Sequence, residues 1–525
     1  MGTYINIGNS GFISARNSEY VDKSALIAIV NKTLNTQQRF ACVSRSRRFG
    51  KSMAAQMLNA YYDESCDSRH LFADLQIASH ADFEKHLNKY PVIFLDITNF
   101  TSRDIPHSEL VSTIAGDIRE EVIDTYPDIK AKDSDDLMEV LIKVSARYRL
   151  QFIMIIDEWD AICREVTDYP EAMDKYVSLL RRLFKGSNTF QVFAGVYMTG
   201  ILPIKKYPTQ SALNNFTEYS MVEPMNMASF FGFTRDEVRM LSLKSGMDFS
   251  ELEKWYDGYQ IGDENSIFNP NSVMMAMRSH RCRSYWATTS AYDPVSNYIN
   301  MNFNGLKDDI IHMLAGGRCG VNPTKFQNDM ALINSRDDVL TLLIHLGYLS
   351  YDWTSNECYI PNYEVLGEMA NAVESNGWKN IADALQASQQ LLQATLNGDE
   401  KAVSRGIELV HDENTSILSY NNENSLACVL SLAYYYARKD YIFHREMPTG
   451  KGFADLVLIP RPNVHAPAMV IELKYDKDTK TALDQIHQRK YPTKVAQYTG
   501  DLLLVGINYD KQQKTHSCRI EKIDF

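Results

Sequence analysis

An apolar segment that leads into a glycine, a lysine and a serine constrains the fold of this chain more than any other feature. Residues Arg39–Val43 predict a buried strand, and Gly50-Lys51-Ser52 open a helical segment that continues through Met53–Tyr61. Between such a strand and helix, backbone N–H groups of the turn and the positive helix N-terminus face an anion. The lysine then reaches the β- and γ-phosphates, and the serine hydroxyl ligates Mg²⁺. Ser44–Ser52 is therefore predicted to bind the phosphates of ATP with Mg²⁺.

One position departs from the usual pattern G-x-x-x-x-G-K-[S/T]. Arg45 stands where the first glycine is expected, and a side chain there restricts the backbone of the loop. A Gly-Lys-Ser tripeptide also occurs by chance. The prediction therefore depends on a second feature elsewhere in the chain.

An acidic pair after another apolar run supplies this second feature. Phe152–Ile156 predicts a buried strand, and Asp157 and Glu158 follow it directly. Asp157 is the candidate carboxylate on the Mg²⁺ side, and Glu158 is the candidate base that orients or activates water. Asp96, after the run Val92–Leu95, competes with Asp157 but has no second carboxylate behind it. A strand end that leads into a solvated acidic loop is the alternative interpretation of the pair.

A third apolar run, Gln191–Met198, ends in Thr199 and Gly200. A polar residue at this strand end is a candidate sensor of hydrolysis beside the γ-phosphate. A plain strand-terminal turn is the alternative.

The chain of 525 residues is long enough for about three domains. Residues 1–225 alternate strand-like and helical segments, which predicts a largely parallel sheet covered on both faces. Residues 226–410 are mainly helical: Thr234 to Glu237 form a capping box, and a helix over 337–347 precedes a hairpin of 348–352 with 357–361. This helix and hairpin are winged-helix-like. Residues 411–525 return to α/β, with strands at 453–459, 468–475 and 501–505 and helices at 423–438 and 480–491.

Residues 15–225 resemble the AAA-ATPase-like domain found in many bacterial proteins. The family commonly carries Arg-Arg-Phe-Gly-Lys-Ser in place of a glycine-led loop, so the resemblance implies that the missing glycine is a family trait. It adds three residues of the loop, Arg47, Arg48 and Phe49, to the nucleotide-binding candidates. The matching stretches are residues 20–24, 44–52, 91–96, 155–160 and 199–200, and the similarity continues at 255–259, 268–272, 285–286 and 346–349.

A second chemistry is indicated near the carboxy-terminus. Glu472 and Lys474 lie at the end of the apolar run Ala468–Ile471 and are two residues apart, so they share one face of a strand. Asp455 lies in an earlier strand that a proline-rich turn folds back toward Glu472. Metal-dependent phosphodiesterases use two such acids to bind Mg²⁺ and a lysine to position water or stabilise charge. A cross-strand salt bridge is the alternative.

These residues, with Glu423 upstream and Gln485 and Tyr491 downstream, resemble the PD-(D/E)XK nuclease domain that often follows the AAA-ATPase-like domain. The resemblance implies that Asp455 and Glu472 are metal ligands and Lys474 is the catalytic lysine. It implies that Glu423 is a third carboxylate at the metal and that Gln485 is a supporting polar group of the catalytic site. Ala454 replaces the usual proline before the aspartate.

Composition limits the compartment and the partners. Eight scattered cysteines without a Cys-x-x-Cys pair favour reduced thiols in a cytoplasmic protein. Neither a secretory signal nor an apolar run long enough to span a bilayer is expected. The net charge of −12 argues against a uniformly basic surface that coats nucleic acid, although a local basic groove stays compatible.

The sequence thus predicts a multidomain α/β chain: a P-loop NTPase sheet, a helical middle region and a restriction-endonuclease-like domain. The first functional hypothesis is an ATP-binding, and by expectation hydrolysing, module that controls a Mg²⁺-dependent nuclease acting on nucleic acid, with DNA the expected substrate. The second is a nucleotide-dependent switch whose nuclease-like domain holds a partner without cutting. A scaffold without turnover is the third. Assembly into a homo-oligomer stays open.

Overall fold

The computed structural model describes residues 2–166, 168–204, 213–286, 305–314, 316–326, 333–375, 390–414, 441–448, 453–461, 466–475, 501–510 and 515–523, with isolated residues between these ranges. The chain divides into two compact units. The first comprises residues 1–289 and 320–365, and the second residues 290–319 and 366–525. The predicted division into three domains at 225 and 410 stays a prediction.

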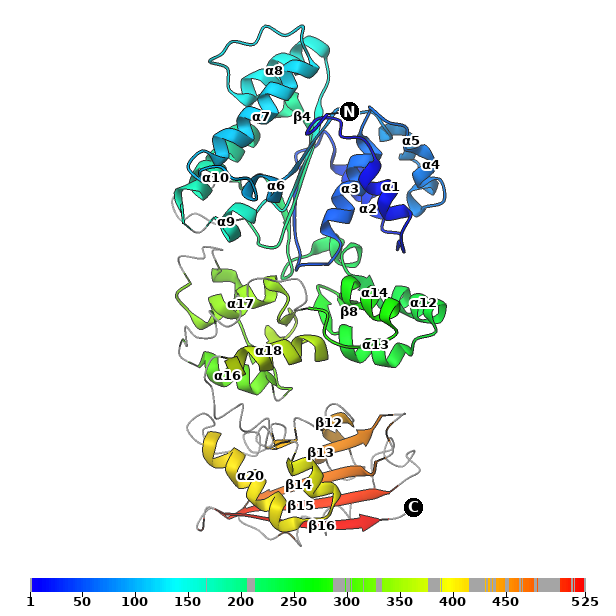
Figure 1. Cartoon of the computed structure of the whole chain (residues 1–525), viewed down its shortest axis with the longest axis vertical. Helices are drawn as coiled ribbons and strands as arrows, with labels where there is room; N and C mark the ends of the chain where they lie inside the picture. Colours follow the sequence, from blue (N-terminus) through cyan, green and yellow to red (C-terminus); the bar gives the residue numbers. More distant parts are fainter. Residues whose placement is uncertain are drawn as a thin grey trace. The chain divides into compact units, whose positions relative to one another are not determined.

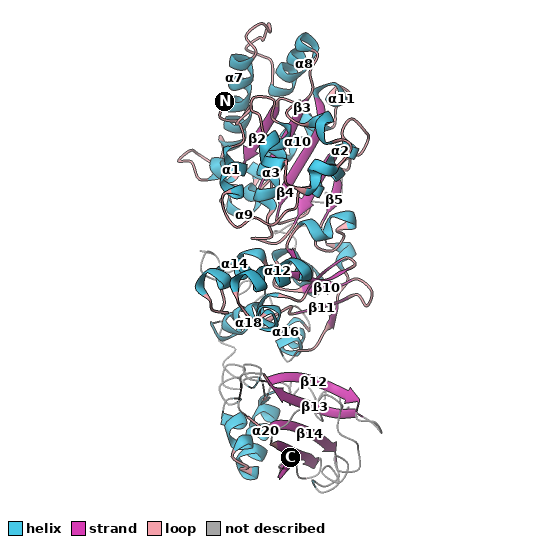
Figure 2. Cartoon of the chain, turned by 90° about the vertical axis from the view of Figure 1, so that its right-hand side faces the viewer, coloured by secondary structure: helices cyan, strands magenta, loops and turns pink. Residues whose placement is uncertain are grey.

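A five-stranded parallel sheet forms the centre of the first unit (Figures 1 and 2). Its strand order is β2-β3-β4-β1-β5, and each neighbouring pair is parallel. The sequence predicted the four longer strands, whereas β5 is too short to give a pattern. The strands are β1 (Phe40–Ser44), β2 (Val92–Asp96), β3 (Phe152–Asp157), β4 (Phe193–Gly200) and β5 (Thr217–Tyr219).

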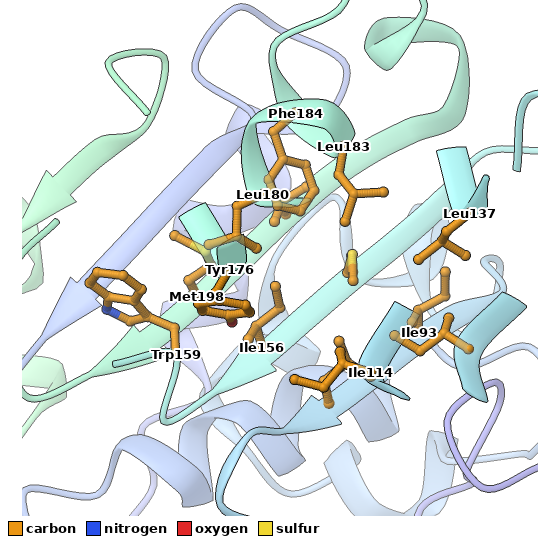
Figure 3. Packing of buried hydrophobic residues seen from close by; sticks show 14 of the residues in the cluster. Ile93, Ile114, Leu137, Ile156, Trp159, Tyr176, Leu180, Leu183, Phe184 and Met198 are labelled. Atoms are coloured by element: carbon orange, nitrogen blue, oxygen red, sulfur yellow. The ribbon is translucent and has the colours of Figure 1, made fainter. Parts of the chain in front are cut away.

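Helices cover both faces of this sheet, which is why β1, β3 and β4 are buried along their whole length. On one side lie α1 (Ser10–Arg16), α2 (Ala25–Thr33) and α3 (Lys51–Tyr62) (Figure 1). On the other, α7 (Leu110–Thr125), α8 (Leu137–Tyr148) and α10 (Glu171–Phe184) pack into the main hydrophobic core, as Figure 3 shows. Short helices complete the layer: α4 (Arg69–Phe72), η1 (Gln76–Ser79), α5 (Phe83–His86), α6 (Thr98–Thr101), α9 (Ala161–Glu165) and α11 (Thr189–Val192).

The rest of the first unit is mainly helical, as predicted, but contains a small antiparallel sheet that the sequence did not indicate. The predicted capping box is present, because Thr234 Oγ1 accepts from Glu237 N at 3.4 Å and the Glu237 carboxylate accepts from Thr234 N at 2.8 Å. The elements are η2 (Met225–Phe230), α12 (Arg235–Ser245), α13 (Phe249–Tyr256), α14 (Pro270–Ser279), and β6 (Phe233–Thr234), β8 (Glu264–Phe268) and β7 (Tyr259–Ile261) in that sheet order.

The predicted helix and hairpin are also confirmed. Helix α17 (Arg336–Leu346) ends at Gly347, which has a φ of +88°. Strands β10 (Ser350–Asp352) and β11 (Glu357–Tyr359) then pair antiparallel and lead into α18 (Tyr363–Ser375). The short elements before them are β9 (Cys319–Gly320), which extends this small sheet, and η4 (Pro323–Lys325).

The second unit is built on a mixed five-stranded sheet in the order β12-β13-β14-β15-β16 (Figure 1). Only β14 and β15 run parallel, and the other pairs are antiparallel. The predicted helices over 423–438 and 480–491 lie largely outside the described residues. The strands are β12 (Tyr441–Pro448), β13 (Phe453–Pro460), β14 (Ala468–Tyr475), β15 (Leu502–Asp510) and β16 (Thr515–Ile523), and the helices are α16 (Leu306–Leu314) and α20 (Glu400–Asn414).

Two expectations from composition concern the described residues alone. Seven of the eight cysteines lie there, and all seven are free thiols. Among the helices of the described residues, none combines the length and apolarity required to cross a bilayer.

Replacement of Gly347 by alanine is predicted to destabilise the protein through both backbone strain and overpacking. Gly246, which has only the first of these, serves as the control. A Cβ atom at Gly347 would lie 2.7 Å from Ser46 Cβ, whereas one at Gly246, with a φ of +70°, would meet nothing within 4 Å. Gly246→Ala therefore carries only the backbone strain of about 1 kcal/mol. Gly347→Ala adds overpacking and is expected to cost about 3 kcal/mol. Thermal unfolding of both variants measures the difference, and equal losses would contradict the contact.

Candidate nucleotide and nuclease sites

The phosphate loop has the backbone that its sequence requires. Gly50 precedes α3 with a φ of +88°, and an added Cβ would meet nothing there, so conformation and not space demands glycine. Arg48 also lies in the left-handed region, at +69°. These two turns bring Lys51 to the first position of a twelve-residue helix, where helix N–H groups are unpaired.

Lys51 is the buried cation of the site. Its side chain is only 3% exposed, and its Nζ donates to the Ser46 carbonyl oxygen at 3.1 Å and lies 3.8 Å from Glu158 Oε1. Burial lowers the pKa of Lys51, and the nearby Glu158 carboxylate partly opposes that effect. A phosphate group would offer this ammonium group a stronger partner than the carbonyl does.

The acidic pair lies beside this lysine, as the sequence predicted. Burial raises the pKa of Asp157 to about 6, although a hydrogen bond from the Ser52 side chain lowers it. The competing candidate Asp96 pairs with Asp157 in the sheet, and its charge adds to the rise. Glu158 has a φ of +51°, a strained conformation of the kind that gathers at functional sites.

Thr199, the candidate sensor of hydrolysis, lies on the strand between the phosphate loop and the acidic pair. It is the last residue but one of strand β4, which lies between β1 and β3, and it is fully buried. Its Oγ1 has no hydrogen-bond partner among the described residues. Buried hydroxyls normally find partners, so this orphan donor fits a ligand oxygen. Lys51, Ser52, Asp157 and Thr199 together suit the phosphates and Mg²⁺ of a nucleotide.

Arg45, the residue in place of the first glycine, points into the protein. It is fully buried, and its guanidinium donates to the carbonyl oxygens of Ser44 and Tyr219 at 2.9 and 2.7 Å and of Met227 at 3.3 Å. The guanidinium also stacks over the Phe231 ring. Burial lowers the pKa of Arg45. Arg45 therefore anchors the loop to the end of β5 and to the segment that follows it, and its side chain points away from the phosphate side.

Three more loop residues contact the helical part of the first unit. Ser46 Oγ donates to the His345 carbonyl oxygen at 3.3 Å, and Arg48 donates to the Tyr285 carbonyl oxygen at 2.6 Å. Phe49 is buried edge-on against the Tyr259 ring, with 5.1 Å between ring centroids. Only Arg47 is exposed. Arg48 and Phe49, predicted as nucleotide-binding, thus make contacts within the protein.

Two further charged residues complete the site, and the motif search did not single them out. Arg164 on α9 forms ion pairs with Glu158 and with Asp160, the latter at 3.1 Å. Asp160 is fully buried and accepts from the backbone N–H groups of Ile201 and Leu202, just beyond β4. Their spacing of four residues on a helix was the available signal. Arg164 therefore connects the candidate base to the end of the candidate sensor strand.

The carboxy-terminal candidates lie on β14 in the second unit. Glu472 is 2% exposed, and Lys474 Nζ lies 2.9 Å from Glu472 Oε1. Strand β13 pairs antiparallel with β14, with Leu456 opposite Ile471. Asp455 and Glu472 are each one residue beyond that pair, so the backbone register brings the two positions together, as predicted.

The remaining nuclease candidates lie beyond what the structure describes. Glu423 and Gln485 fall outside the described residues, and only the backbone of Asp455 is described. Among the described side chains, no three His, Cys, Asp or Glu residues gather to hold a metal ion. Mg²⁺ is commonly bound through one or two carboxylates with water, so Glu472 with Asp455 is a compatible donor set.

The parallel sheet, the loop and the acidic strand end define the class of a P-loop nucleotide-binding protein. Two family models match the chain: residues 5–208 match "Predicted AAA-ATPase", and residues 421–518 match "PD-(D/E)XK nuclease superfamily". The chain therefore carries an AAA-ATPase-like domain and a carboxy-terminal domain of the PD-(D/E)XK nuclease superfamily.

Individual relatives are distant. An "Uncharacterized protein in vnfD 5'region" of Azotobacter chroococcum mcd 1 is 24% identical over 294 residues, which cover 54% of this chain and 53% of the relative. The chain thus spans about half the length of that relative. Two solved structures of the Aeropyrum pernix ORC2 protein, one with ADPNP and ADP and one with ADP, are 12% and 11% identical. Their TM-scores are 0.32 and 0.29, over 69% and 71% of this chain and 97% and 99% of theirs.

Restoring the consensus glycine at Arg45 is predicted to weaken the loop. Arg45→Gly removes a buried guanidinium and leaves the Tyr219 and Met227 carbonyl oxygens without this donor, so the loop loses its anchor. The affinity for ATP, measured by calorimetry, is expected to fall about tenfold, or about 1.4 kcal/mol. Arg47→Gly, two positions further along the loop at an exposed residue, adds the same backbone freedom without loss of the anchor and should lower the affinity for ATP by less than Arg45→Gly does. Unchanged or tighter ATP binding by Arg45→Gly would contradict the anchoring role.

Proposed function

We propose that this protein binds and hydrolyses ATP with Mg²⁺ and that its carboxy-terminal domain is a Mg²⁺-dependent nuclease controlled by the nucleotide. One observation carries the first part: the buried Lys51, the Asp157–Glu158 pair and the unpartnered Thr199 hydroxyl converge where β1, β4 and β3 end. The match of residues 421–518 to a nuclease superfamily supports the second part.

The proposed hydrolysis begins with a change of partner at Lys51. In the structure, its ammonium group is shared by the Ser46 carbonyl oxygen and Glu158. Phosphate oxygens would draw Lys51 toward them and leave Glu158 paired with Arg164. Glu158 would then accept a proton from the attacking water, while Thr199 contacts the γ-phosphate. Mg²⁺, held by Ser52 and Asp157, would neutralise charge that develops on the phosphates.

The proposed nuclease chemistry uses the face of β14. Glu472, with Asp455, would hold the metal ion, which activates water and stabilises the phosphorane charge. Lys474, held 2.9 Å from Glu472, would position that water or stabilise the transition state. Nucleic acid is the proposed partner, with DNA the expected substrate. The alternative, a switch with an inactive nuclease-like domain, is favoured only by the net charge of −12.

ATP turnover tests the first part and the role of Arg164. Lys51→Ala should abolish turnover, and Glu158→Gln should lower kcat at least 100-fold because the base is lost. Arg164→Gln should lower kcat about tenfold with little change in KM, because Glu158 loses its orientation. Arg182→Gln is the matched control. Arg182 lies on α10, and its ion pair with Asp136 is about half exposed, so its loss should leave kcat unchanged. Turnover that survives Lys51→Ala would refute the proposed hydrolysis.

Cleavage assays test the second part. Linear, circular and single-stranded DNA and RNA are incubated with the protein and Mg²⁺ or Mn²⁺, with and without ATP. We expect metal-dependent cleavage that Lys474→Ala lowers at least 100-fold. Lys522→Ala removes a lysine of the same sheet that pairs with Asp501 and should leave cleavage unchanged. Absence of cleavage, or cleavage equal in Lys474→Ala, would favour the switch.

A further inference from the structure

Strand register places residues beside Glu472 and Lys474 that neither the motif nor the family match assigns. Residues paired across neighbouring strands lie on the same face of a sheet. On the parallel neighbour β15, Gly506 pairs with Glu472 and Asn508 pairs with Lys474. The face of the candidate catalytic residues therefore continues onto β15 with a glycine and an amide.

The same register extends to the edge strand β16. Arg519 pairs with Gly506, and Ser517 pairs with Asn508. Because β16 is the last strand of the sheet, these two side chains end the rows. Two rows thus cross the sheet on one face: Glu472, Gly506 and Arg519 in one, and Lys474, Asn508 and Ser517 in the other.

This face changes character along the strands. Two and four residues before Glu472, Val470 and Ala468 belong to a buried apolar cluster, with Val457, Leu502 and Leu504 on neighbouring strands. A face that served only the core would continue apolar. Here it carries Glu472 and Lys474 on β14 and Asn508 on β15. On β16 it carries Ser517, Arg519 and Glu521, of which Glu521 already pairs with the apolar Leu504. The polar residues thus form one patch around the candidate catalytic pair.

The patch runs from a buried acidic end on β14 to an exposed basic end on β16. Glu472 and Asn508 are 2% and 5% exposed, whereas Ser517 and Arg519 on the edge strand are exposed. Within the described part of the chain, Arg519 makes no ion pair. It lies two strand spacings from Glu472, about 10 Å, and Gly506 between them has no side chain. An arginine reaches far enough to hold a phosphate next to one that a metal ion at Glu472 would bind.

We propose that Arg519, with Ser517, binds backbone phosphates of the nucleic-acid strand that enters the nuclease site, and that Asn508 positions Lys474. The proposal rests on the proposed nuclease function. A guanidinium group binds phosphate by two parallel charge-assisted hydrogen bonds, and a hydroxyl group adds a third donor. Asn508 is buried beside Lys474, so its amide restricts the lysine side chain without contacting nucleic acid.

Binding and cleavage assays distinguish the phosphate contact of Arg519 from the positioning role of Asn508. In the Lys474→Ala background, fluorescence anisotropy with a labelled oligonucleotide across salt concentrations measures affinity in Mg²⁺. Arg519→Ala should weaken binding about tenfold and reduce the slope of log affinity against log salt by about 1. Arg519→Lys should retain most of the affinity. In the active protein, Arg519→Ala should raise KM at constant kcat, whereas Asn508→Ala should lower kcat about tenfold at constant KM.

Lys522→Ala is the matched control, because Lys522 lies on the same strand but pairs with Leu503 and so faces the other side. It should change neither the salt slope nor KM. An Arg519→Ala slope equal to that of wild type, or equal effects of Arg519→Ala and Lys522→Ala, would overturn the phosphate contact. An Asn508→Ala variant with unchanged kcat would overturn the positioning role. If the wild type binds oligonucleotide but does not cleave it, the nuclease proposal fails while the anisotropy result still decides the Arg519 contact.

Discussion

The first unit depends on how one buried ammonium group is held. Lys51 has almost no access to water, and its partners are a loop carbonyl and the Glu158 carboxylate. A buried charge without partners would be far too costly, so the loop and the end of β3 must keep their positions for the fold to tolerate it. The parallel sheet provides that constraint, because the carboxyl ends of β1, β3 and β4 meet at one edge. The polar site is thus a condition of the fold as well as a place for a ligand.

The same constraint explains why the loop lacks its first glycine. In a glycine-led loop, backbone freedom lets the chain wrap a phosphate. Here Arg45 fixes the loop from behind through three carbonyl oxygens, and Ser46, Arg48 and Phe49 add contacts to the helical part of the unit. Movement of the loop on nucleotide binding would therefore change its hydrogen bonds to the carbonyl oxygens of Tyr285 and His345. This physical connection is local to the first unit.

The features that sequence predicted and those that it missed differ in kind. The strand ends at Asp157 and Thr199 and the helix start at Lys51 were predictable, because apolar runs stop where polar residues begin. The antiparallel pairing of β13 with β14, which brings the positions of Asp455 and Glu472 near each other, followed from a short turn between adjacent strands. The direction of the Arg45 side chain was not predictable, since a basic residue in a phosphate loop suggests contact with phosphate. The Arg164 pair and the rows through Asn508 and Arg519 depend on tertiary geometry and on a register between distant strands, which no local pattern records.

The two candidate sites share one physical device, a lysine held close to a glutamate. In both, the lysine lies within 4 Å of a carboxylate, and an anionic ligand would compete for the lysine. The difference lies in the second partner of the carboxylate. Glu158 also pairs with Arg164, so it keeps a cation when Lys51 turns to phosphate. Glu472 lies 2.9 Å from Lys474, and a divalent cation bound at this carboxylate would compete with Lys474 for it and free the lysine for a phosphate group. Metal and nucleic acid should therefore bind to the second site cooperatively, whereas the first site is arranged to keep its base in place.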